Sequence, residues 1–145
     1  MLKIVAVMEV FTSYFGMKAK LEEAGILPVS IALWKPRWYE GLEYKKIAPK
    51  AFMLKGEYSQ DEYIMFYQRF ILDKLKVDEV LEDLERLGDG KDIALLCYEK
   101  PGDFCHRHLF AEWLLKQTGW EIQEFKPKSS EQKRSDFEGQ QFELF

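Results

Sequence analysis

The segment LLCYEKPGDFCHRHLFAEWL carries the side chains of this sequence that are best suited to catalysis. Cys97 and Glu99 end an apolar run that is typical of a buried strand. After a short loop with Pro and Gly, Cys105, His106 and Arg107 open a segment with helical spacing. Open α/β sheets bind ligands at the carboxyl ends of their strands, and helix N-termini favour anions. The spacing therefore predicts a site at which these five residues meet.

Each of these side chains has a chemical role that fits such a site. A thiol in the first turn of a helix has a lowered pKa, which makes Cys105 a candidate nucleophile. Glu99 can act as a general base or orient His106, which is itself an acid–base candidate. Arg107 can hold a phosphate or carboxylate through two hydrogen bonds. We predict Cys105, His106 and Glu99 as catalytic residues, and Arg107 and Cys97 as part of an anion or nucleic-acid site.

Other interpretations of this cluster stand beside the anion site. Cys97, Cys105 and His106 can bind zinc, but a structural zinc site needs four ligands and no fourth is evident, so we predict no metal. A phosphatase-type loop is absent, because Arg107 follows Cys105-His106 directly. Alternatively, both cysteines are buried core thiols and Arg107 pairs with Glu99 to lock the loop. The sequence leaves the anion site and this structural alternative open, and it identifies no cofactor.

The same stretch resembles the signature of the family catalogued as domain of unknown function 488. The pattern L-L-C-x-E…P…C-H-R-x-L-x-A-x-x-L is matched by Leu95, Leu96, Cys97, Glu99, Pro101, Cys105, His106, Arg107, Leu109, Ala111 and Leu114. The segment VSIALWKPRW, residues 29–38, resembles the family's segment after its second strand. The resemblance covers roughly residues 2–125. It implies an α/β fold and a shared site around these residues, and it implies no reaction.

A segment rich in aromatic and basic residues follows the second apolar run. WKPRWYEGLEYKKIAPKAFMLK interleaves Trp and Tyr with Lys and Arg. Cations can hold a phosphate backbone while aromatic rings stack on bases. The alternative is a large loop whose rings pack on the domain and whose lysines are solvated. We predict that Arg37, and with it Lys35, belongs to the site, because the segment follows the end of a strand.

The elements that must position these residues follow from hydrophobic patterning. The apolar runs at residues 2–10 and 26–33 predict buried strands. A helix is predicted between them, with Thr12 or Ser13 as its N-cap and Gly25 at its end. Residues 34–57 are predicted to be irregular, and Ser59 and Glu62 have the spacing of a capping box. Two helices, a buried strand at 92–98, a helix at 105–118 and a last strand at 120–125 follow. This pattern predicts one α/β domain with a mostly parallel sheet flanked by helices.

Length, charge and cysteine content limit the classes of protein to consider. The chain has 145 residues and a net charge of −4, so it lacks the basic surface that gives strong stand-alone affinity for nucleic acid. No apolar run is long enough to cross a membrane, and no signal peptide is recognisable. The two cysteines favour a reducing, cytoplasmic setting over a disulfide framework.

The last twenty residues differ in composition from the rest of the chain. Residues 126–140 are polar and carry Pro, Ser and Gly, which predicts a flexible linker after a domain at 1–125. Residues 141–145 have the form Q-x-x-L-F, which resembles the peptide that docks bacterial repair and replication proteins onto the sliding clamp. The resemblance assigns clamp contacts to Gln141, Phe142, Leu144 and Phe145. The alternative is a tail that folds back on its own domain.

These observations combine into one functional hypothesis. We expect a DNA-maintenance protein that a sliding clamp holds at DNA, with a nucleotide or nucleic-acid site at Cys-His-Arg and an unknown reaction. A clamp tether would supply the local concentration that the acidic chain cannot gain by charge. The alternatives are a non-catalytic module that binds the clamp or another partner, and a small-molecule enzyme unrelated to DNA. Whether the chain is an enzyme stays open.

Overall fold

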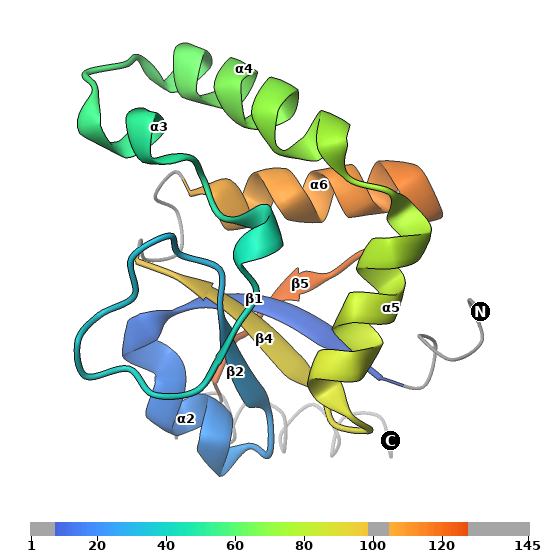
Figure 1. Cartoon of the computed structure of the whole chain (residues 1–145). Coiled ribbons are helices and arrows are strands. Elements are labelled where there is room, and N and C mark those ends of the chain that lie inside the picture. The colour runs from blue at the N-terminus through green and yellow to red at the C-terminus, as the bar shows by residue number, and fades with distance from the viewer. Residues whose placement is uncertain (1–7, 99–104, 128–145) are drawn as a thin grey trace, which may run out of the picture.

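Parallel strands form a sheet in the order β3-β2-β4-β1-β5 (Figure 1). The computed structural model describes residues 8–98 and 105–127. The strands are β1 (Val10–Tyr14), β2 (Leu27–Ser30), β3 (Leu42–Glu43), β4 (Ile93–Cys97) and β5 (Gln123–Glu124). This order puts β4 at the centre of the sheet, with β2 on one side of it and β1 on the other.

The central strand β4 is buried along its whole length. Its side chains alternate between the two faces of the sheet, as a strand requires. Ile93, Leu95 and Cys97 belong to the larger hydrophobic cluster, whereas Ala94 and Leu96 belong to a second, smaller cluster. The alternation therefore directs Cys97 to the face that carries the larger core.

Helices cover both faces of this sheet (Figure 1). On the smaller cluster lie η1 (Phe15–Met17) and α2 (Lys18–Glu23). On the side of the larger cluster lie α4 (Gln60–Phe70), η3 (Leu72–Lys74), α5 (Val77–Gly88) and α6 (His106–Thr118). The sheet is all parallel and flanked by helices in a single domain, which confirms the fold class predicted from the sequence.

Two of the helix boundaries follow from local chemistry. The Ser59 hydroxyl accepts a hydrogen bond from the Glu62 amide, and the Glu62 carboxylate accepts one from the Ser59 amide. This confirms the capping box predicted at the start of α4. Helix α6 ends at Gly119, whose φ of 79° is a left-handed conformation that glycine adopts without strain.

The segment between β2 and α4 is more regular than the sequence predicts. It contains β3, η2 (Lys45–Ile47) and α3 (Ala51–Lys55), so the expectation of an irregular segment at 34–57 is wrong in part. Buried tyrosines anchor it: the Tyr39 hydroxyl donates to the Leu42 carbonyl at 2.8 Å, and the Tyr44 hydroxyl donates to Asp83 at 2.7 Å. The bond to Asp83 ties to α5 a segment whose own sequence shows no periodicity.

The first strand and the helix after it begin later than predicted. The strand was predicted at residues 2–10, whereas β1 begins at Val10, so the two share only this residue. Residues 2–7 lie outside the described residues. Thr12 and Ser13 are buried strand residues and do not cap a helix. Residues on both sides of Val10 are equally suited to a strand, so strand preference alone does not set where β1 begins. The pairing of Val10 with Ile93 of β4 sets it.

Two further predictions concern the ends of the described region. The predicted linker at 126–140 and the clamp-like peptide at 141–145 lie almost wholly outside the described residues. Among the residues that the structure describes, no helix is both long and apolar enough to span a membrane. The boundaries at residues 125 and 140 stay predictions.

Candidate functional site

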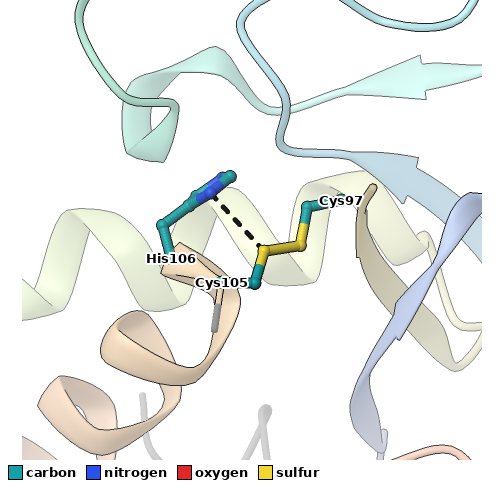
Figure 2. Close-up of side chains that lie close together, drawn as sticks. All are labelled: Cys97, Cys105 and His106. Carbon is teal, nitrogen blue, oxygen red and sulfur yellow. Dashed lines mark hydrogen bonds between the residues drawn. A yellow bond between two sulfur atoms is a disulfide. The ribbon is translucent and has the colours of Figure 1, made fainter. Parts of the chain in front are cut away.

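Cys97 and Cys105 meet at the carboxyl edge of the sheet. Cys97 is the last residue of β4, and Cys105 is the residue that caps the N-terminus of α6. Their sulfur atoms form a disulfide across a sequence separation of eight residues (Figure 2). The expectation that both thiols stay reduced is therefore wrong for this structure. A strand end and the helix start that follows it lie side by side in an α/β sheet, and the two sulfurs point to the same face.

His106 lies against this disulfide and is almost completely buried. Its Nε2 lies 2.9 Å from the Ile31 carbonyl oxygen. Figure 2 shows its other ring nitrogen, Nδ1, facing Cys105 Sγ at 3.7 Å. A carbonyl oxygen only accepts hydrogen bonds, so Nε2 must carry the proton and Nδ1 keeps its lone pair. The imidazole therefore presents a basic nitrogen to the sulfur of Cys105.

The electrostatic surroundings keep His106 neutral. Burial, which acts against the hydrogen bond to Ile31, and the nearby charges of Arg107 and His108 together lower its pKa from 6.5 to about 4. A neutral imidazole can accept a proton or bind a metal at neutral pH, whereas a protonated one can do neither. The acid–base role of His106 stays a prediction, because a nitrogen with so low a pKa is a weak base in the resting site.

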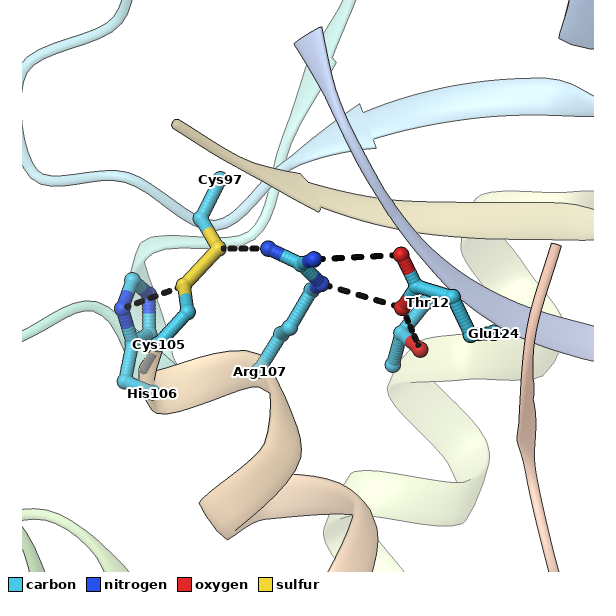
Figure 3. A network of polar contacts seen from close by, with 6 residues as sticks. All are labelled: Thr12, Cys97, Cys105, His106, Arg107 and Glu124. Atoms are coloured by element: carbon cyan, nitrogen blue, oxygen red, sulfur yellow. Dashed lines mark hydrogen bonds and ion pairs between the residues drawn. A yellow bond between two sulfur atoms is a disulfide. The ribbon is translucent and has the colours of Figure 1, made fainter. Parts of the chain in front are cut away.

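Arg107 is fully buried behind the disulfide (Figure 3). Its Nε and Nη2 each donate to one carboxylate oxygen of Glu124 at 3.1 Å, and its Nη1 donates to Cys97 Sγ at 2.9 Å. The Thr12 hydroxyl donates to Glu124 at 2.7 Å. The guanidinium thus links the end of β4 to β5 and holds the sulfur of Cys97 in place.

An apolar cavity of about 420 Å³ opens beside the cysteines. Aromatic side chains on three different segments contribute to it: Trp34, Tyr58, Tyr63 and Tyr98. Cys97, Cys105 and His106 line it as well, together with Ala32, Leu33, Pro49, Leu54, Ser59 and Gln60. A cavity of this size and lining suits a small organic molecule with a flat ring.

A family model described as "Active DUF488-N3 subclade" matches residues 27–118, from β2 to the end of α6. The chain belongs to the DUF488 family. No curated protein and no solved structure matches it. The matched region holds Cys97, Cys105, His106 and Arg107, whereas Thr12 and Glu124 lie outside it.

The DUF488 site does not bring every predicted residue to the cavity. Lys35 and Arg37 are exposed and do not line it; Lys35 forms an ion pair with Glu43, with the charged atoms 3.7 Å apart. Glu99 lies outside the described residues, so both its catalytic role and its proposed pairing with Arg107 stay predictions. The carboxylate that the structure places on Arg107 is that of Glu124, which the sequence did not single out.

Tyr98 and Trp34 are further residues of this DUF488 cavity that the sequence did not assign to the site. The Tyr98 hydroxyl donates to the Trp34 carbonyl, which joins the end of β4 to the segment after β2. Both rings are about half exposed, at 53% and 52% of their surface. Both residues follow strands, Trp34 after β2 and Tyr98 after β4, and ligands bind at the carboxyl ends of strands. This rule could have identified them from the sequence.

The DUF488 cluster also offers donor atoms for a metal ion. Cys97, Cys105 and His106 are buried, and one ligand atom from each lies within 4.8 Å of the others. In the disulfide form the sulfurs are not thiolates, so binding of a metal requires reduction. The arrangement can therefore support thiol chemistry or metal chemistry, depending on the oxidation state of the two cysteines.

Proposed function

We propose that this DUF488 chain binds a nucleobase, as part of a nucleotide or of single-stranded nucleic acid, in the cavity beside Cys105 and His106. One observation carries the proposal: aromatic side chains line a cavity that two cysteines and the imidazole of His106 also line. Flat bases stack on such rings, and each stacked base contributes ~1–3 kcal/mol. The ring of Trp34, about half of it exposed, is the candidate stacking surface.

The charge distribution supports recognition of a base more than recognition of a long phosphate backbone. The chain carries a net charge of −4, which opposes tight binding to a polyanion. Basic side chains nevertheless lie near the cavity: Lys55 Nζ is 5.8 Å from the centroid of the Trp34 ring. Lys35 follows Trp34 directly, Arg37 comes after Pro36, and both are exposed. These cations can contact one phosphate group of a ligand whose base occupies the cavity.

The chemistry at the site depends on reduction of the disulfide. Reduced Cys105 lies beside the His106 Nδ1, which can accept a hydrogen bond from the thiol and take up its proton only as the sulfur attacks. Arg107 is engaged by Glu124 and does not line the cavity. In this proposal it is therefore a positioning residue for Cys97, and the ligand does not contact it.

A calorimetric titration tests the proposal on the reduced, full-length chain. The probes are a nucleoside monophosphate and a short single-stranded DNA. The expected result is saturable binding of at least one probe, weakened about tenfold by Trp34→Ala because one stacked ring is lost. Trp38→Ala is the matched control, since Trp38 is as exposed as Trp34 but does not line the cavity. Absence of binding, or equal losses in the two variants, would contradict the proposal.

We also propose that the peptide Gln141–Phe145 docks onto a bacterial sliding clamp. Support comes from the sequence alone: Gln141 can hydrogen-bond at the rim of a pocket, while Phe142, Leu144 and Phe145 bury apolar surface. Docking would raise the concentration of the cavity at DNA without a basic surface. Calorimetry against a purified clamp should give binding that the variant Leu144→Ala/Phe145→Ala loses. Absence of binding by the intact chain would contradict docking onto the clamp. It would not affect the proposal that the cavity binds a nucleobase.

A further inference from the structure

We propose that the reduced chain binds one soft divalent cation, such as Zn²⁺, through Cys97 Sγ, Cys105 Sγ and His106 Nδ1. The three donor atoms lie within 4.8 Å of one another and come from the end of β4 and the start of α6 (Figure 2). Sulfur and imidazole nitrogen are the donors that Zn²⁺ and Co²⁺ prefer, and they discriminate against Mg²⁺ and Ca²⁺. The inference goes beyond nucleobase binding and does not depend on it.

The orientation of His106 matches that of a metal ligand. Histidines that bind metals usually donate their other ring N–H to a carbonyl or a carboxylate, which fixes the free nitrogen toward the ion. Here the Ile31 carbonyl takes that role at 2.9 Å from Nε2. The 3.7 Å from Nδ1 to Cys105 Sγ is close to the ~3.5 Å that separates nitrogen and sulfur ligands on one tetrahedral zinc ion.

Charge balance in the buried site also favours a divalent cation. Two bare thiolates would place two negative charges beside an arginine whose charge Glu124 already balances. A divalent ion neutralises the two thiolates. The hydrogen bond that Arg107 Nη1 donates to the sulfur of Cys97 is an outer-shell contact of the kind that orients a metal ligand. A histidine ligand binds as the neutral imidazole and adds no further charge. Among the residues that the structure describes, the ion, its ligands, Arg107 and Glu124 then carry no net charge together.

The number of donors indicates an open site. In the described part of the chain, the cluster supplies three protein ligands, one fewer than a closed structural zinc site. All three residues line the aromatic cavity. The remaining position on the ion therefore lies toward the cavity, where water or a ligand atom can bind.

Formation of the site requires a reductant and releases protons. A phosphine reductant breaks the disulfide: it gives up two electrons, becomes a phosphine oxide with oxygen from water, and leaves two thiols. Binding of the divalent ion then replaces the two thiol protons, which pass to the buffer. Because the chain has only two cysteines, a count of two free thiols certifies that the reduction is complete.

The test is a titration of the reduced, full-length chain with Co²⁺ under nitrogen, followed by its absorption spectrum. The expected result is one ion per chain with a thiolate-to-cobalt charge-transfer band, which Zn²⁺ displaces. Cys97→Ser and Cys105→Ser should each diminish the band strongly, and His106→Gln should lower the affinity at least tenfold. His108→Ala, on the exposed side of the same helix, should bind like the parent chain. The oxidised chain should not bind.

Circular dichroism of each variant ensures that a loss of binding is not a loss of fold. If the folded, fully reduced parent chain gives no charge-transfer band, the proposal is overturned. It is also overturned if the band persists unchanged in both serine variants. Full affinity in His106→Gln would remove His106 from the ligand set. Since no nucleotide is present, failure here is distinguishable from failure of nucleobase binding.

Discussion

Arg107 and Glu124 form a two-point ion pair in the interior of the protein. Two guanidinium nitrogens each lie 3.1 Å from one carboxylate oxygen, and the arginine side chain has no exposed surface (Figure 3). A buried charge that loses its partner is strongly destabilising. The pair therefore fixes Arg107 beside Cys97 and ties α6 to β5, the short edge strand of the sheet.

Removal of the carboxylate should destabilise the fold. We expect Glu124→Ala to lower the free energy of unfolding by about 3 kcal/mol, because the guanidinium would stay buried without its counter-charge. Urea unfolding measures the change. Glu121→Ala is the matched control, since Glu121 is an exposed residue just before the same strand. Equal stability of the two variants would contradict the structural role of the pair.

Stability should depend on pH through His106. Its pKa is about 4 in the folded chain against 6.5 ordinarily, so between these values the unfolded chain binds a proton that the folded chain does not. Stability should therefore fall as the pH decreases from 6.5 to 4, by up to about 3 kcal/mol from this residue. In His106→Gln, unfolding curves across this range should show a shallower decline. Parallel declines in the parent chain and the variant would exclude this contribution.

Reduction of the disulfide should lower stability. The bridge closes a short loop, with a sequence separation of eight residues. The entropy of closing such a loop in the unfolded chain corresponds to about 2–3 kcal/mol. Urea unfolding with and without a phosphine reductant measures the difference, and Cys97→Ala/Cys105→Ala should not respond to the reductant. An unchanged midpoint in the parent chain would show that the bridge does not stabilise it.

Zinc should restore stability to the reduced chain. A ligand that binds only the folded state stabilises it, and the gain grows with the logarithm of the ratio of ligand concentration to dissociation constant. The midpoint of urea unfolding should therefore rise with added Zn²⁺ in the reduced parent chain, and should need at least tenfold more Zn²⁺ for the same rise in His106→Gln. A midpoint that zinc does not change would argue against the metal site independently of the cobalt spectrum.

The sequence predicted the parts of the fold that local patterns control. The strand predicted at 92–98 and the helix predicted at 105–118 were found to within one residue at each end, and the capping box of Ser59 and Glu62 was found as predicted. Each depends on residues near one another in the chain, where hydrophobic run length and capping chemistry act directly.

The parts that were missed depend on distant segments. The pairing of β1 with β4 sets the position of the first strand, and several starting points have similar strand preference. Glu124 reaches Arg107 only because β5 pairs with β1, and the strand predicted at 120–125 does not by itself show which strand it pairs with. The disulfide likewise depends on how β4 and α6 meet in space, which cysteine count alone does not reveal.

The measurement that tests the central claim most directly is NMR mapping of the reduced, full-length chain titrated with a nucleoside monophosphate. The account predicts saturable shifts of the amide signals of residues around the aromatic cavity, namely Ala32, Trp34, Tyr63, Cys97 and His106. A second cavity between α4 and α6, lined by residues that include Gln68 and Trp113, should stay unaffected. Shifts confined to that second cavity, or no shifts at all, would contradict the account.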